Sequence, residues 1–422
     1  MKTKIILLVV LVLLAAVVVG NIIYGNKLAK EIDAGLKEKI ANNELPVAIE
    51  YTGVKVNPLF SQVKIKDISV GALNKEATFK CEMLDIDIPY KEAQRWLEST
   101  EFEAINSLKI KLVKPEVRGE DENVSVIFDD VTVDFDGQLS KEDFDNMETR
   151  FPDKKQELLL SFSGLKVKLP ENTYSNPPLS QLQEQLTSID AGNYTLVYNP
   201  ELKEIYIREF SIESPVISYK GHATFKYEGE GGRDFEPKTA AMESRLRLEP
   251  KHFEWEDENG GKGEFQLDKL VFNTNSTMSF DQKTFPQGDM DLEVVNLKIQ
   301  YDNPNTNNGQ SMMSLSMSDL DVERFNFNYH LDREKLSITN SRIKSSLLDA
   351  YINADVDMDL SNPANSTIKE AKVTVHDLAP DLEKMVNGFE QQMGKELPRE
   401  NGAIVLELSG KLARPTIKGF EF

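Results

Sequence analysis

The histidines of this chain, which could bind zinc, are few and far apart. Its four histidines, His222, His252, His330 and His376, stand in separate stretches, and no two have the spacing of zinc ligands. Structural zinc sites usually draw their Cys and His ligands from close pairs along the chain. We therefore expect no metal site.

Three alternating aspartates, Asp355, Asp357 and Asp359, resemble the start of a calcium-binding loop. Such a loop needs Gly at its sixth position and Glu at its twelfth. This chain has Leu360 and Ser366 there. Because residues two apart point to the same side of a β-strand, the aspartates are predicted to line the solvent face of a strand.

Other catalytic and phosphate-binding motifs are missing from the sequence. Cys81 is the only cysteine, and an isolated cysteine in a strand is usually a packing residue. There is no Gly-x-Ser-x-Gly elbow and no His-Glu-x-x-His helix. The glycine-rich stretches 229–232 and 260–263 lack the P-loop spacing, so they are predicted to be turns between strands. We expect no enzyme activity, no catalytic residue and no cofactor.

A recurring six-residue pattern indicates the elements that surround these residues. An apolar residue, two mostly polar residues and then apolar, polar, apolar follow one another, as in residues 65–70. The last three positions alternate as in a half-buried strand, but the first and fourth would lie on opposite faces. A one-residue β-bulge would restore the phase and bend the strand, so the pattern predicts a curved sheet. It starts at Ile65, Ile105, Phe128, Phe162, Ile207, Leu267, Val294, Met317 and Ile368.

The charge of the chain excludes one class of partner. Its 422 residues include 70 acidic and 49 basic ones, interspersed, with a net charge of −21. Most of such a surface would repel a phosphate backbone, so nucleic-acid binding is excluded.

The N-terminal apolar run is long enough to cross a bilayer, for which about 20 residues are needed. A cleaved signal peptide is the alternative, but its apolar core would be about 7–15 residues long and would end at a small-x-small site. We expect an uncleaved anchor, with residues 26–422 outside the cytoplasm. Its predicted membrane residues are Ile5, Ile6, Leu7, Leu8, Leu11, Leu13, Leu14, Val17, Val18, Ile22 and Ile23.

The predicted fold class is mainly β with a minor α component. An N-terminal transmembrane helix is followed by a long, curved antiparallel β-sheet or β-groove with a few short helices. The expected segments are an anchor (1–25), a helical stalk (26–46), a first β-rich segment (47–170), a linker with a short helix (171–193) and a second β-rich segment (194–422).

Residues 381–394 are predicted to form a C-terminal amphipathic helix, with Pro380 before it. We expect its apolar face to pack on the core; a helix lying on a membrane surface is the alternative. The face consists of Leu382, Met385, Val386, Phe389 and Met393.

Two stretches resemble the AsmA-like family of bacterial envelope proteins. The first stretch is the anchor with the strands at residues 51–59 and 63–70. The second comprises residues 350–357, the helix after Pro380 and residues 406–417. Residues 406–417 are similar to the C-terminal sequence motif of that family. The resemblance implies a single-pass protein of the inner (cytoplasmic) membrane with its bulk in the periplasm. It also implies a hydrophobic β-groove that moves phospholipid in support of outer-membrane biogenesis.

The expected function is therefore lipid binding or transport by a membrane-anchored protein. Membrane lipids are the expected partners, with a phospholipid as ligand and envelope proteins as possible further partners. The general layout also resembles the YdgA-like family, which gives the alternative of an anchored structural or adaptor protein without a lipid ligand. The residues that would contact lipid cannot be named from the sequence, because a ligand-binding face and a core face have the same composition.

Overall fold

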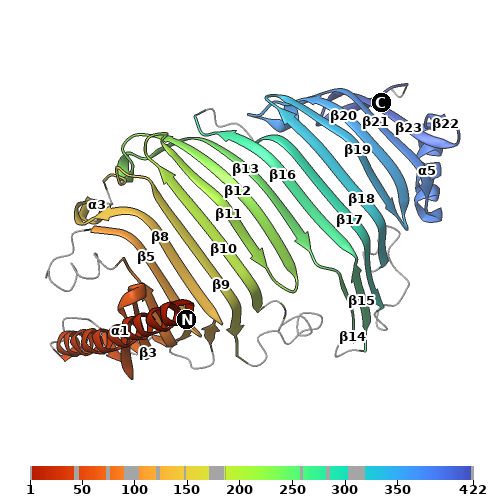
Figure 1. The fold of residues 1–422 in the computed structure, drawn as a ribbon. Coiled ribbons are helices and arrows are strands. Elements are labelled where there is room, and N and C mark those ends of the chain that lie inside the picture. Colours follow the sequence, from red (N-terminus) through yellow and green to blue (C-terminus); the bar gives the residue numbers. More distant parts are fainter. Residues whose placement is uncertain are drawn as a thin grey trace. The chain divides into compact units, whose positions relative to one another are not determined.

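The computed structural model describes the backbone in eleven stretches of the chain and omits the side chains of residues 2–20 and of a few other positions. The described stretches are 2–41, 47–72, 77–89, 104–119, 124–146, 149–170, 185, 187–256, 260–281, 286–302 and 319–419. The chain forms two compact units, each built on an antiparallel sheet (Figure 1). Unit 1 comprises residues 1–173, 187–212 and 228–236, and unit 2 comprises 174–186, 213–227 and 237–422.

Helix α1 (Lys2–Ala41) is continuous through the described residues of the expected anchor and stalk. Its second half packs against unit 1: the Asn21 side chain donates to Asn57 Oδ1 at 2.8 Å and accepts from the Leu59 backbone N–H at 2.8 Å. A Cβ on Gly25 would lie 2.4 Å from the Val56 carbonyl oxygen, so glycine permits this close approach.

The membrane anchor falls mostly outside the described side chains. Residues 5–18 of the predicted set are among those whose side chains are not described, while Ile22 and Ile23 are 55% and 67% exposed. Within the described part of the chain, no helix meets the length and hydropathy needed to span a membrane.

Unit 1 holds the first eleven strands, and Figure 1 shows β5, β8, β9 and β10 side by side. Their alternating apolar and polar residues favour pleated strands with two different faces. The strands are β1 (Val47–Glu50), β2 (Gly53–Asn57), β3 (Gln62–Ala72), β4 (Ala77–Asp87), β5 (Ala104–Val113), β6 (Glu116–Gly119), β7 (Ser125–Ile127), β8 (Asp130–Ser140), β9 (Gln156–Lys168), β10 (Ser188–Asn199) and β11 (Glu204–Glu213); a 3-10 turn, η1 (Pro58–Phe60), joins β2 to β3.

A row of five residues crosses unit 1 where the six-residue pattern breaks phase. Strand register places Asp67, Glu82, Lys114, Asp129 and Gly164 opposite one another in turn, and we call them the boundary row. Every second member has left-handed backbone: φ is 49° at Asp67, 48° at Lys114 and 60° at Gly164. Lys114 also forms an ion pair of 2.8 Å with Glu82.

The expected β-bulge is therefore only partly confirmed. Around Asp67, Lys66 pairs with Met83 and Ile68 with Cys81, so no residue is inserted. The alternation is instead interrupted by one residue with left-handed backbone at the third position of the pattern. This residue is Asp67 in the first pattern, and Gly164 and Asn296 have the same position and conformation in two others. A true inserted residue is found in β21, where the register shifts after Ile368.

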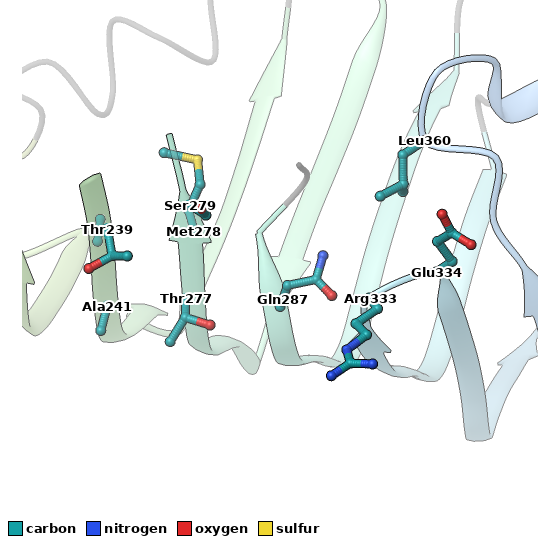
Figure 2. Close-up of a pocket in the computed structure, with 10 residues that line it drawn as sticks. Thr239, Ala241, Thr277, Met278, Ser279, Gln287, Arg333, Glu334 and Leu360 are labelled. Atoms are coloured by element: carbon teal, nitrogen blue, oxygen red, sulfur yellow. The ribbon is translucent and has the colours of Figure 1, made fainter. Parts of the chain in front are cut away.

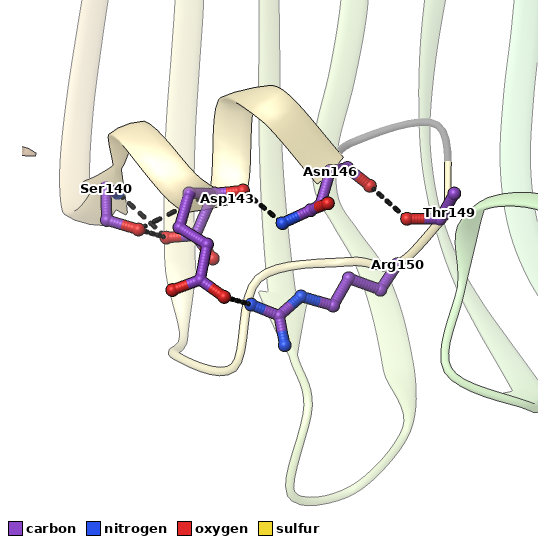
Figure 3. A network of polar contacts seen from close by, with 6 residues as sticks. Ser140, Asp143, Asn146, Thr149 and Arg150 are labelled. Carbon is purple, nitrogen blue, oxygen red and sulfur yellow. Dashed lines mark hydrogen bonds and ion pairs between the residues drawn. The ribbon is translucent and has the colours of Figure 1, made fainter.

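A short helix, α3 (Lys141–Asn146), follows β8 and is capped by its own side chains (Figure 3). Asp143 Oδ2 accepts from the Ser140 hydroxyl at 2.6 Å, and the Ser140 oxygen accepts from the Asp143 backbone N–H at 3.1 Å. The second bond satisfies one of the backbone N–H groups that a helix start leaves unpaired. Arg150 then forms an ion pair of 2.8 Å with Glu142, which holds the segment after the helix.

Unit 2 holds the remaining strands, of which β17 and β18 are bent along their length in Figure 1. The predicted turns at 229–232 and 260–263 do connect strands, with positive φ at Gly229, Gly231 and Gly260. The strands are β12 (Ile217–Glu228), β13 (Glu236–Leu248), β14 (Lys251–Glu256), β15 (Lys262–Leu267), β16 (Lys269–Ser279), β17 (Gln287–Asp302), β18 (Asp319–Asp332), β19 (Lys335–Ser345), β20 (Leu348–Asp357), β21 (Thr367–Leu378), β22 (Arg399–Glu400), β23 (Ala403–Lys411) and β24 (Arg414–Ile417); 3-10 turns are η2 (Gly232–Asp234) and η3 (Pro363–Asn365).

The C-terminal helix α5 (Pro380–Met393) is present, and Gly394 ends it with φ of 65°. It contacts β21, but none of its side chains is buried. Met385, Phe389 and Met393 are 54%, 37% and 38% exposed, so the expected packing of this face in the core is wrong. The helix expected within 171–193 lies mostly outside the described residues, and β10 begins at Ser188.

Candidate functional site

A row of apolar side chains crosses seven strands of unit 1. Directly paired residues of antiparallel strands share a face, so each pairing extends the row by one strand. The row, from β2 to β10, is Val56, Val63, Ile86, Ile110, Val133, Leu160 and Tyr194. Parallel rows on the same face add Val54, Ile65, Leu84, Leu108, Leu112, Val131, Phe135, Leu158, Phe162 and Leu196. We call this set the apolar face of unit 1.

On the opposite face of the same strands, the row directly behind the apolar row is polar throughout, whereas other rows of that face include Met83, Val113, Leu159 and Val197. The neighbouring row runs Lys55, Lys64, Asp85, Lys111, Thr132, Ser161 and Asn193. Ion pairs cross this face, with Lys64 Nζ 3.0 Å from Asp85 and Lys109 Nζ 2.8 Å from Asp134. The sheet of unit 1 is therefore two-sided along these two rows.

No side chain of the apolar face of unit 1 is buried, and Leu160 at its centre is 37% exposed. In a closed core such residues would lose nearly all contact with water. Gly192 contributes to the smooth surface, because a Cβ there would lie 2.3 Å from the Phe162 ring. The face is a contiguous apolar surface of the kind that marks a binding site.

The boundary row interrupts the apolar face with charged residues. Asp67, Glu82 and Lys114 lie two positions beyond Ile65, Leu84 and Leu112 and line a shallow pocket of about 520 Å³. Apolar pairs continue past this row, with Ile68 opposite Cys81 and Val70 opposite Phe79.

Unit 2 has a comparable apolar row over eight strands, but Val294, Ala350 and Ile404 in that row are buried. A row of paired residues from β13 to β23 consists of Leu248, Leu270, Val294, Phe325, Ile343, Ala350, Val375 and Ile404. Here the end toward β21 is covered: Val356, Ile368 and Ala371 are buried together. The opposite face again carries ion pairs, including Arg342 with Asp349 at 2.8 Å.

The four histidines lie in separate places in the structure. His222, His252 and His330 each face one carboxylate, at 3.6, 3.3 and 2.7 Å, and His376 packs edge-on against Tyr351. In the described part of the chain, no three possible ligands gather in a metal site.

Two of the three aspartates lie on a strand as predicted, and the prediction is wrong for Asp359. Asp355 accepts from the Ser337 hydroxyl at 2.7 Å and Asp357 pairs with Lys369 at 2.8 Å, while Val356 between them is buried. Asp359 lies past the strand, where hydrogen bonds from Ser361 and from the Asn362 backbone lower its pKa.

Cys81 is 3% exposed, and its thiol donates to the Met83 carbonyl at 3.0 Å. Burial raises the pKa of this thiol, which disfavours the reactive thiolate.

Sequence reasoning found the strands but missed the members of the apolar face. Leu158, Leu160 and Tyr194 fall outside the repeated pattern or only at its margin, and their common face depends on the pairing of β8, β9 and β10. The alternation of apolar and polar residues over 131–135 was the sequence signal that could have identified part of this face.

Comparison with known proteins adds no relative. The chain matches no protein-family model, no curated protein and no solved structure.

Proposed function

We propose that the chain is a membrane-anchored lipid-binding protein of the cell envelope, whose apolar sheet faces hold acyl chains. The observation that carries this proposal is the contrast in unit 1 between an uninterrupted apolar row, in which no side chain is buried, and the polar row directly behind it. A sheet that served only as a scaffold in water would not need seven consecutive strands with an apolar side that stays in partial contact with water.

The dimensions of the face suit an acyl chain. Six steps between neighbouring strands at about 4.8 Å give the apolar row a length of about 29 Å. The hydrocarbon core of a whole bilayer is about 30 Å thick, so one leaflet is about half as deep as the row is long. The row is therefore long enough to hold an acyl chain over its full length. Each CH₂ removed from water contributes about 0.8 kcal/mol, so chain length alone supplies affinity without a specific polar contact.

The ion-paired face supports the same function. Its Lys64–Asp85 and Lys109–Asp134 pairs are partly exposed and keep that side in water while the other side is covered by lipid. A lipid bound in this way needs no catalytic group. As the lipid moved along the row, its acyl chain would exchange one set of apolar contacts for an equivalent set.

The proposed function includes the N-terminal membrane anchor. Residues 5–23 would hold the chain in the inner membrane, with the two units in the periplasm, as the AsmA-like resemblance implies. Phospholipid transport toward the outer membrane is the proposed role. In the alternative, an adaptor of the YdgA-like kind, the apolar face would be covered by protein and would bind no lipid.

The test uses two matched double variants of the full chain. Val133→Gln with Leu160→Gln places two amides on the apolar face, whereas Thr132→Gln with Ser161→Gln makes the same change on the polar face of the same two strands. We expect the first variant to bind roughly tenfold less phospholipid from vesicles and the second to match the unchanged chain, because an unpaired amide costs about 1–3 kcal/mol in an apolar environment. Equal lipid binding by all three proteins would contradict the proposal, provided that their circular dichroism spectra agree.

A further inference from the structure

The turn between β2 and β3 carries two large apolar side chains that stand in water. Leu59 and Phe60, in the 3-10 turn η1, are 59% and 65% exposed. The turn has a fixed backbone, because the Ser61 N–H donates to the Pro58 carbonyl at 3.3 Å and Ser61 has a left-handed φ of 51°. Both side chains are therefore presented to the surroundings by a preformed turn.

Two exposed isoleucines of α1 lie beside this turn. Asn21 accepts from the Leu59 backbone N–H at 2.8 Å. Ile22 and Ile23 follow Asn21 and are 55% and 67% exposed. Four of the five most exposed large apolar side chains that the structure describes thus lie in these two adjoining segments, and the fifth is Leu202 at 63%. Such a group marks a contact surface, whereas exposed apolar residues that are scattered singly do not.

Contacts with unit 1 fix the orientation of this part of α1. Asn21, Gly25 and Asp33 all touch unit 1, and their spacing in multiples of four residues puts them on one side of the helix. Gly25 lies against the carbonyl of Val56, the first residue of the apolar row, and Asp33 accepts from the Tyr51 hydroxyl at 2.8 Å. The helix is therefore fixed on β2, and its two exposed isoleucines stay uncovered.

The position of Asn21 in α1 gives the depth of the turn in a membrane. Residues 5–23 extend over about 28 Å at about 1.5 Å per residue, close to the hydrocarbon thickness of a bilayer, which is about 30 Å. Tyr24 follows, and tyrosine is enriched where hydrocarbon meets water. Asn21 lies about 3 Å from the end of this run, so the turn bonded to it would stand at the edge of the hydrocarbon. Its amide, the one polar side chain within residues 5–23, bonds Asn57 and Leu59 and so avoids the cost of an unpaired polar group there.

A pocket of about 690 Å³ in unit 2 offers no comparable apolar surface (Figure 2). The register of β13 and β16 places Thr239, Thr277 and Ser279 of its lining on the face opposite to the apolar row of that unit. Figure 2 shows Arg333 and Glu334, in the turn between β18 and β19, extending in opposite directions. The polar lining of this pocket therefore lies on the side of the sheet away from the apolar row.

We infer that Leu59 and Phe60 insert into the periplasmic leaflet of the membrane beside the anchor and hold β2 against the bilayer. The inference rests on the proposed function, because it requires residues 5–23 to span the membrane. Lipid is favoured over a protein partner because α1, which would carry the anchor, places the turn at the edge of the hydrocarbon. Val56, where the apolar row begins, would then lie at the membrane surface.

The experiment reconstitutes the full chain in phosphatidylcholine vesicles and measures the quenching of one added tryptophan by brominated acyl chains. The unchanged chain is the blank for the two native tryptophans. Phe60→Trp is expected to lose most of its added emission, and to lose more to bromine near the carboxyl end of the acyl chain than to bromine near the methyl end. Leu14→Trp, at the middle of the apolar run, should show the reverse order.

Leu202→Trp is the matched control, because Leu202 is about as exposed as Phe60 and lies in the turn between β10 and β11 of unit 1. Its added emission should be unchanged. Quenching of Leu14→Trp alone would overturn the contact of the turn with the membrane and leave the anchor and the proposed function intact. If none of the three is quenched, the chain does not span the bilayer, and the inference fails together with the anchored function. Equal quenching of Phe60→Trp and Leu202→Trp would show unspecific association with lipid and would also overturn the inference.

Discussion

Gly164 in β9 faces the carboxylate of Asp129 across the boundary row so closely that a Cβ on Gly164 would lie 2.0 Å from Asp129 Oδ2. The same glycine has φ of 60°, a left-handed conformation. The sheet of unit 1 thus depends on glycine at this position for two independent reasons.

Gly164→Ala is expected to lower the free energy of unfolding. The left-handed conformation costs a residue with a Cβ about 1–2 kcal/mol, and displacement of Asp129 adds to this. Denaturant titration of the full chain measures the change. Gly71→Ala is the control, because no atom lies within 4 Å of a Cβ there, and this variant should unfold like the unchanged chain. Equal free energies of unfolding for Gly164→Ala and Gly71→Ala would show that the boundary row does not require glycine at position 164.

The ion pair of Arg342 and Asp349 should make unit 2 sensitive to acid. The Asp349 carboxylate accepts from Arg342 Nε at 2.9 Å and is only 13% exposed, and the guanidinium lowers the pKa of Asp349. Because the folded pKa lies below the unfolded value of about 4, the stabilisation is complete above that pH and is lost as the pH falls through the folded pKa.

Asp349→Asn should therefore be less stable at neutral pH by about 1–3 kcal/mol and should lose part of the acid dependence. Urea titrations between neutral and acidic pH provide the measurement. Asp381→Asn is the control: it removes an exposed ion pair with Lys384 and should leave the dependence of the unfolding free energy on pH unchanged. An acid profile of Asp349→Asn identical to that of the unchanged chain would contradict the assignment.

Tyr51 should report the docking of α1 on unit 1. Its hydroxyl donates to Asp33 Oδ1 at 2.8 Å, and burial together with this hydrogen bond raises the pKa of Tyr51 to about 12. The stabilisation is present below the unfolded pKa of about 10 and is lost as the pH rises through the folded value. Burial also raises the pKa of Tyr194, so a UV absorbance titration should show more than one late tyrosine, and Tyr51→Phe should reduce the late absorbance change by one tyrosine. A Tyr51→Phe variant with the same late step would contradict this docking.

Cys81 should react with thiol reagents only when the sheet opens. Burial and the raised pKa both reduce the thiolate available for attack. Maleimide labelling at neutral pH should be slow in the folded chain and fast in denaturant. Rapid labelling of the folded chain would show that β4 is open to solvent.

The sequence predicts much of the fold and little of the site. Alternation reveals strands such as β3 and β8 locally, because period two is a property of a single strand. The apolar face also requires the pairing of Val133 with Leu160 and of Leu160 with Tyr194, and register depends on contacts far apart in the chain.

One detail was beyond the sequence for a similar reason. The phase break at residue 67 was visible, but a bulge and a single left-handed aspartate give the same local pattern, and only the strand pairing distinguishes them.

The central claim is that the apolar faces carry lipid. The most direct measurement is mass spectrometry of organic extracts from the full chain, purified from its native membrane with a detergent that is then exchanged for an amphipathic polymer. We predict phospholipid bound in a fixed ratio to protein, and a marked loss in the Val133→Gln with Leu160→Gln variant but not in the Thr132→Gln with Ser161→Gln variant. Protein that is folded yet free of lipid in repeated preparations, or a ratio equal in all three, would contradict the account.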